Sequence, residues 1–272
     1  MNPTSKDAVA NSVESRTASV AAESAVFAGR LITRWRRDPM VPVQALLFPT
    51  VLLVVYHLLI SKSMVKVMGT DNIALVVAMC ALAGAMSGSL ASALSIPVER
   101  DSGLLSRFWV MPVHRMSPLS GILLAEAVRT FAGTLLIVTV GAMFGLRFDS
   151  RLIGAALFVL IPVLWIVVFA TVVITVAVHS GNRTMLTWFA TGVMGLAFGN
   201  SSVVPVKVLP SWVRPLIEFQ PMSPTILAMR ALSEGGPVLA PLLITTGWIV
   251  LLGAVFLPLA VSGFRKASES GD

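Results

Sequence analysis

Few residues of this chain could perform chemistry, because only 12% of its 272 residues are charged and it has three histidines. The sequence Gly199-Asn200-Ser201-Ser202, taken with His179, could supply a serine nucleophile and its base. Those two side chains must lie within hydrogen-bond distance, whereas a membrane-spanning helix between them would separate them by roughly 30 Å at 1.5 Å per residue. We therefore expect no catalytic residue, and the Gly199 to Ser202 run to mark the outer end of a span.

Metal and nucleotide sites are equally poorly supported. His57, His114 and His179 are far apart along the chain and have no cysteine or carboxylate at ligand spacing, so no metal is expected. The dipeptide Gly-Lys is absent from the sequence, so the chain has no phosphate loop of the GxxxxGK[ST] kind and needs no cofactor of its own. The net charge of +7 is scattered along the flanks of apolar runs, which favours membrane lipid as the counter-charge and disfavours nucleic acid.

Charge is concentrated in one short segment, 99–115, between two long apolar runs. Residues of both signs can set the register on a partner protein, and the apolar residues among them can anchor an interface. A chain that otherwise avoids charge is expected to place this segment in water or against a partner. The candidate contact residues are Glu99, Arg100, Asp101, Gly103, Leu104, Leu105, Arg107 and Phe108.

Two polar features lie inside apolar runs. Glu126 and Arg129 are three residues apart, where ionisable side chains are costly unless paired, so we favour a structural pair and keep a gating or substrate-facing role as the alternative. Gly84, Gly88 and Ser92 recur every four residues, and small residues let another helix approach closely. That spacing predicts tight packing within the subunit, or else a seam with a partner subunit or the wall of a translocation path.

The elements that must position these residues are membrane-spanning helices. The chain is 56% hydrophobic with a mean hydropathy of +0.87, which excludes an ordinary soluble domain. Its apolar runs are too long and too uniform for outer-membrane strands, so the predicted fold is all-α and polytopic. We predict a single transmembrane domain, 25–272, with six spans at about 42–60, 73–97, 119–144, 152–178, 185–204 and 239–263.

The first residues, 1–24, have no apolar core and are expected to form a flexible cytoplasmic tail. Between 25 and 37 the pattern predicts an amphipathic helix in the membrane surface, whose arginines reach anionic headgroups; a solvated basic run is the alternative. The residues that carry this pattern are Phe27, Arg30, Leu31, Arg34 and Trp35.

The basic residues favour both termini in the cytoplasm, because the inner segments then hold more lysine and arginine than the outer ones. With that orientation the segment 99–115 is cytoplasmic. Between the last two spans, 205–236 is too polar to cross a membrane yet contains two apolar stretches. Two short helices that dip into the outer leaflet and return would fit, and an amphipathic extracellular loop is the alternative.

Several motifs in this order resemble the permease subunit of a type-2 ABC exporter, over roughly 25–266. They are Arg36-Arg37-Asp38-Pro39, the segment from Glu99 to Arg107, Met111-Pro112-Val113-His114-Arg115, Gln220-Pro221-Met222-Ser223-Pro224 and Arg230-Ala231-Leu232. The chain is most similar to the daunorubicin-resistance type of actinobacteria, in particular the mycobacterial permeases that export complex lipids. Trp109 and the terminal Arg265-Lys266-Ala267-Ser268 contribute to that resemblance.

The resemblance implies a multi-pass protein of the bacterial cytoplasmic membrane that pairs with a sister permease or a second copy of itself. Two copies of a separate ABC ATPase would bind ATP and Mg²⁺. The segment from Glu99 to Arg107 would be the coupling helix seated on that ATPase, and the amphipathic helix would give a second contact. The short outer helices would form the extracellular gate for a hydrophobic small-molecule or lipid substrate.

Two other classes of protein remain possible from the sequence. A secondary transporter would need intramembrane carboxylates or broken-helix ion sites, and only Glu126 qualifies. A channel-like or structural membrane protein would need no ATPase. Copurification with an ATPase subunit would separate the exporter from both.

Overall fold

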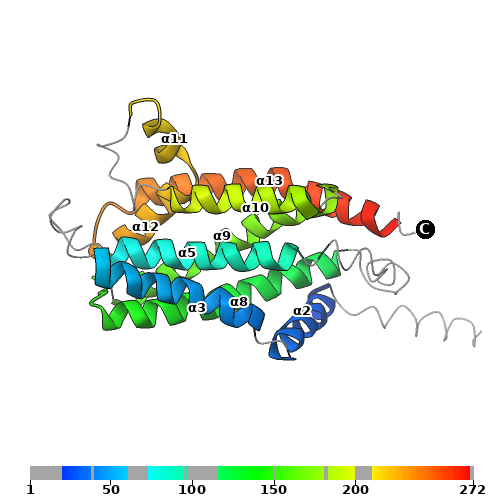
Figure 1. Cartoon of the computed structure of the whole chain (residues 1–272), viewed down its shortest axis with the longest axis horizontal. Coiled ribbons are helices and arrows are strands. Elements are labelled where there is room, and N and C mark those ends of the chain that lie inside the picture. The colour runs from blue at the N-terminus through cyan, green and yellow to red at the C-terminus, as the bar shows by residue number, and fades with distance from the viewer. Residues whose placement is uncertain are drawn as a thin grey trace, which may run out of the picture.

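The computed structural model describes residues 20–37, 40–60, 73–94, 96, 116–149, 151–180, 183–199 and 210–269. Within these ranges all regular structure is helical, which confirms the predicted all-α fold. The long helices run side by side along one axis, and the chain reverses direction from each to the next (Figure 1). The helices are α2 (Val20–Arg37), α3 (Met40–Val55), which continues as the π-helix η1 (Tyr56–Ile60), α5 (Ile73–Ala93), α8 (Ser117–Met143), α9 (Arg151–Ser180), α10 (Arg183–Phe198), α11 (Arg214–Phe219), α12 (Met222–Glu234) and α13 (Leu239–Glu269).

Four stretches are long and apolar enough to cross a membrane, namely Ile73–Ala93, Ser117–Met143, Leu152–Ser180 and Leu239–Gly263. They fall on α5, α8, α9 and α13 and match four of the six predicted spans. The other two predicted spans, 42–60 and 185–204, fall on shorter helices. The first contains Pro49, which lacks an amide proton, and its α-helix gives way to a π-helix after Val55.

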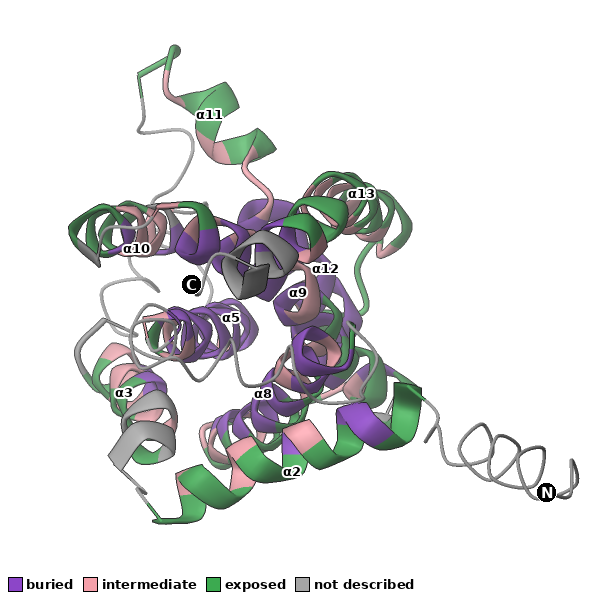
Figure 2. Ribbon diagram, turned by 90° about the vertical axis from the view of Figure 1, so that its right-hand side faces the viewer, coloured by how far each residue is buried: buried purple, intermediate pink, exposed green. Residues whose placement is uncertain are grey.

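Helix α5 forms the centre of the bundle. It contacts α3, α8, α9, α10 and α12, and 89% of the residues in its most apolar stretch are buried (Figure 2). Its sequence is rich in alanine, glycine and serine, and such small side chains allow several helices to approach its backbone. The span at the core of the protein is therefore one that is rich in small residues.

Helix α12 is buried against α5, α9 and α13, although it is far too short to span a membrane. Its last turn is tied to the connection between α8 and α9, because Ser233 Oγ donates to the Arg147 carbonyl over 2.6 Å and the Asp149 amide donates to the Ser233 carbonyl over 3.0 Å. Gly235 then ends the helix at φ 74°, a conformation that favours glycine. The packing favours a short packed helix over a surface loop for Met222–Glu234.

Helix α11 precedes α12 and has no buried residue; Figure 1 shows it projecting from the body of the bundle. Helix α2 lies across the opposite end, where it packs on α8 (Figure 2). The C-terminal end of α13 lies at that same end of the molecule as α2 (Figure 1). The two ends of the chain's helical part therefore share one side of the bundle.

Candidate functional site

A buried ion pair between α8 and α5 is formed by Glu126 and Arg129, which lie three residues apart on α8. Only 1% of Glu126 and 6% of Arg129 is exposed. Arg129 Nη2 donates to the Glu126 carboxylate and to the Ala85 carbonyl, the latter over 3.3 Å, while Ser92 Oγ donates to Glu126 Oε1 over 2.6 Å. Helix α5 thus supplies polar partners to both members of the pair, as burial of two charges requires.

The predicted small-residue face of α5 packs against this same pair. A Cβ atom added to Gly88 would overlap the Arg129 guanidinium, so any larger residue there would displace the arginine from its present position. Gly84 lies one turn earlier, and with Arg129 it lines a small cavity between α5 and α8. The structure therefore joins the two predicted features, the small-residue face and the ion pair, into one cluster within the subunit.

Helix α2 reaches this cluster through Trp35, whose ring centroid lies 5.7 Å from Arg129 Cζ, within the range of a cation–π contact. The apolar positions Phe27, Leu31 and Trp35 are half-buried, whereas Arg30 and Arg34 are exposed. The amphipathic pattern is therefore correct, and the apolar face of the helix packs on α8. The apolar side of α2, which the sequence predicts to lie in the membrane surface, therefore contacts another helix of the same chain.

The contact between α2 and α8 contains polar residues that the sequence analysis missed. Ser117 Oγ donates to Glu23 Oε2 over 2.6 Å, and the hydroxyls of Ser24 and Ser120 lie 2.6 Å apart. A Cβ atom at Gly121 would overlap the Phe27 side chain. We call these residues of α2 and of the first turns of α8 the α2–α8 clamp. Two sequence features could have indicated this contact. Glu23 is the one acidic residue of the basic helix α2, and small residues recur three and four positions apart at the start of α8.

The eight predicted coupling residues, from Glu99 to Phe108, lie outside the described residues. The helices on either side are described: α5 ends at Ala93 and α8 begins at Ser117. Ser117 belongs to the α2–α8 clamp and follows the charged segment by two residues along the chain.

Catalytic and metal chemistry gain no support from the described part of the chain. It holds no group of three or more histidine, cysteine or acidic side chains that could bind a metal ion. His179 Nδ1 lies 2.8 Å from the Thr175 carbonyl of its own helix, and its ring packs against Gly263 of α13. Ser201 lies outside the described residues, so the predicted separation of these two side chains is untested.

A cleft of about 570 Å³ opens at the end of the bundle opposite α2, between the α11–α12 region and the start of α13. Its wall combines the apolar side chains of Leu227 and Ile244 with the charged side chains of Glu218, Arg230 and Glu234. Arg230 Nε donates to Glu234 Oε2 over 2.7 Å, in a pair that is more than a third exposed. The cleft has the size and mixed lining of a small-molecule site.

The chain is similar in sequence to known membrane proteins. Residues 24–232 match the family described as ABC-2 type transporter. The chain is 35% identical over 250 residues, 91% of its length and 90% of the relative's, to a probable doxorubicin resistance ABC transporter permease protein DrrC of Mycobacterium tuberculosis. It is 26% identical over 182 residues, 63% of its length and 61% of the relative's, to a daunorubicin resistance ABC transporter permease protein DrrB1 of Streptomyces coeruleorubidus. The chain belongs to the ABC-2 type transporter family, as a multi-pass membrane permease subunit of an ABC exporter.

Proposed function

We propose that this permease exports a hydrophobic small molecule, namely a lipid, a polyketide or a drug, across the bacterial cytoplasmic membrane. Two relatives are named for resistance to doxorubicin and daunorubicin, which supports an amphipathic drug as one cargo. The family implies an ABC ATPase as a partner, because the permease has no phosphate loop of its own. ATP and Mg²⁺ would be bound by that ATPase, and a sister permease or a second copy of this chain would complete the path.

The observation that carries the mechanism is the α2–α8 clamp. The charged segment 99–115 connects α5 to α8, and the first turn of α8 is hydrogen-bonded to α2 through Ser117 and Glu23. A displacement of the segment by the ATPase would therefore act on α8 and α2 together. Through the contact of Trp35 with Arg129 the same displacement would reach the buried ion pair between α8 and α5.

This mechanism requires one orientation of the protein in the membrane. The segment from Glu99 to Arg107 and the amphipathic helix α2 would both face the cytoplasm, with the two termini. The exposed arginines Arg30 and Arg34 would then lie at the level of the anionic inner headgroups. The α11–α12 region and the cleft beside it would lie on the outer side, where they are placed to act as the gate.

Copurification and reconstituted transport test this function. A tagged copy of the chain, purified from native membranes, is expected to bring an ABC ATPase with it. In proteoliposomes the complex should move doxorubicin, used here as the probe, only when ATP is present. Transport of the probe without an ATPase would instead support a secondary transporter or a channel.

Substitutions in the charged segment test the coupling role. Reversing the charge of Glu99 and Arg107, or replacing Gly103 with tryptophan, should abolish ATP-driven transport while the permease still inserts and binds its sister subunit. The matched controls are Glu99→Asp and Arg107→Lys, which keep each charge and should keep transport. Normal ATPase binding and export in the charge-reversed variant would exclude this segment as the coupling site.

A further inference from the structure

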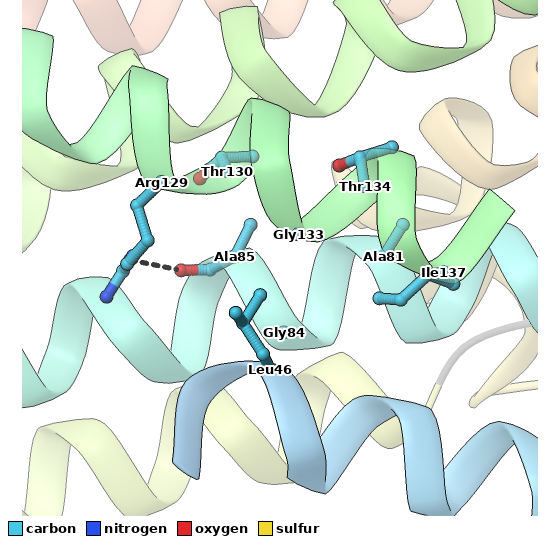
Figure 3. Close-up of a pocket in the computed structure, with 9 residues that line it drawn as sticks. All are labelled: Leu46, Ala81, Gly84, Ala85, Arg129, Thr130, Gly133, Thr134 and Ile137. Atoms are coloured by element: carbon cyan, nitrogen blue, oxygen red, sulfur yellow. Dashed lines mark hydrogen bonds between the residues drawn. The ribbon is translucent and has the colours of Figure 1, made fainter. Parts of the chain in front are cut away.

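A very small cavity, about 10 Å³, lies where α3, α5 and α8 meet (Figure 3). Helix α8 forms most of one side of it with Arg129, Thr130, Thr134 and Ile137, while α5 contributes residues such as Gly84. Among the described residues that line the cavity, Leu46 comes from α3.

Three of the lining residues carry a buried polar atom without a hydrogen-bond partner, namely Arg129 Nη1, Thr130 Oγ1 and Thr134 Oγ1. The exposed fractions of these residues are 6%, 3% and 1%. Buried polar groups are normally paired, and in a membrane interior water is not freely available to pair them. The two threonine hydroxyls, one turn apart on the helix that lines the cavity, therefore need a polar partner.

The two threonines differ from several other threonines in the described helices. Thr139, two turns further along α8, bonds to the Leu135 carbonyl over 2.7 Å, and Thr175 and Thr245 bond in the same way to carbonyls of their own helices. This local bond is the usual means by which a threonine satisfies its hydroxyl inside a helix. The hydroxyls of Thr130 and Thr134 do not make it, which leaves them available to a ligand.

The size and charge of the site select the ligand. A cavity of 10 Å³ is at the lower limit for one water molecule, about 10–15 Å³, and is too small for anything larger. An anion is disfavoured because the Glu126 carboxylate already neutralises Arg129. Side chains four residues apart on a helix have Cβ atoms about 5–6 Å apart, so one water can bond to both hydroxyls.

We propose that this cavity binds one ordered water molecule, which bridges the hydroxyls of Thr130 and Thr134 beside the Arg129 guanidinium. The water would supply the partner that the two threonine hydroxyls lack among the described residues. The site lies within this chain and does not depend on the identity of the cargo.

Replacing each hydroxyl by a methyl group tests the proposal, because the two possibilities predict opposite signs. If the water is bound, Thr130→Val and Thr134→Val each remove one of its partners and should lower the unfolding temperature of the purified transporter. If the cavity is dry, valine relieves an unpaired buried hydroxyl and the unfolding temperature should rise. Thr139→Val is the control, since its hydroxyl is exposed and bonded within its own helix, and should shift little.

The double variant sharpens the test. Both hydroxyls hold the same water, so Thr130→Val/Thr134→Val should lower the unfolding temperature by less than the sum of the two single shifts. A raised or unchanged unfolding temperature in the single variants, or fully additive shifts in the double variant, would overturn the proposal.

Radiolytic hydroxyl-radical labelling reads the water directly, because bound water yields radicals where bulk solvent has no access. Ile137, which is 2% exposed and lines the cavity, should be labelled in the intact transporter. Leu82, which is 0% exposed and does not line it, is the control. Labelling of Ile137 should fall to the level of Leu82 in the double valine variant. Equal labelling of the two residues in the unaltered protein would exclude the water.

Discussion

Helices α5 and α13 have nearly the same mean hydropathy, 2.1 and 2.2 in their most apolar windows, yet 89% of the first window is buried and 6% of the second. Hydropathy thus identifies both as spans without indicating where either lies. The difference is in side-chain size: α5 is rich in alanine, glycine and serine, while α13 presents large side chains such as Leu239, Leu243 and Val250 outward. Small residues bring helices together, whereas large apolar residues suit lipid as well as protein.

The largest difference in stability between the two helices is expected when a glycine in each is replaced by leucine. Gly88→Leu in α5 places a side chain where the Arg129 guanidinium lies, so it adds an overpacking strain to the loss of a buried ion pair. We expect a destabilisation of at least about 4 kcal/mol, and little folded permease in the membrane. The control is Gly247→Leu in α13, where nothing lies within 4 Å of the added Cβ. The folded yield and the midpoint of detergent-induced unfolding are measured for both variants. Equal losses in the two variants would contradict the closer packing of α5.

The second prediction compares the stability contributed by a buried ion pair with that contributed by an exposed one. Arg129→Met leaves the Glu126 carboxylate buried without its cation, which should cost about 3–5 kcal/mol. Arg230→Met removes the same kind of contact from the Glu234 pair, which is more than a third exposed, and should cost about 0–1 kcal/mol. Unfolding midpoints of the two variants are compared. A similar small cost for both would show that the central pair is not desolvated.

Leucine truncation measures the packing difference itself. Leu82 in α5 is 0% exposed, so Leu82→Ala should cost about 2–5 kcal/mol through the cavity it leaves. Leu243 in α13 is 65% exposed, and Leu243→Ala should change stability by about 0.5 kcal/mol or less in the isolated subunit. A large loss at Leu243 would indicate that another protein chain, rather than lipid, covers this face of α13.

The smallest expected effect concerns the α2–α8 clamp. Ser117→Ala removes the hydroxyl that donates to Glu23, and a hydrogen bond to a charged group is worth about 1.5–3 kcal/mol. The matched change in α13 is Ser262→Ala, at an exposed hydroxyl bonded within its own helix, which should be close to neutral. Limited proteolysis of α2 reads the result, because α2 should become more accessible in the first variant only. Unchanged cleavage would show that Glu23 and Ser117 do not hold α2 in place.

Many residues of the site could be predicted individually, but the contacts between them could not. The spacing of Glu126 and Arg129 indicates a pair, and the four-residue repeat of Gly84, Gly88 and Ser92 indicates close packing. Both patterns are local, since residues three or four apart share a helix face. That Gly88 makes room for Arg129 depends on how α5 and α8 cross, and a one-sequence pattern carries no information about that crossing.

The sequence by itself determined the all-α membrane fold, four of the spans, the amphipathic character of α2 and the family, because these depend on composition, periodicity and motif order along the chain. Only the tertiary structure decided that α5 is central and α13 peripheral, that α2 docks on α8, and that α12 is buried. The physical reason is that lipid is as apolar as the protein interior, so hydrophobicity cannot assign helices to inner and outer positions. Those positions follow from shape and from hydrogen bonds between helices.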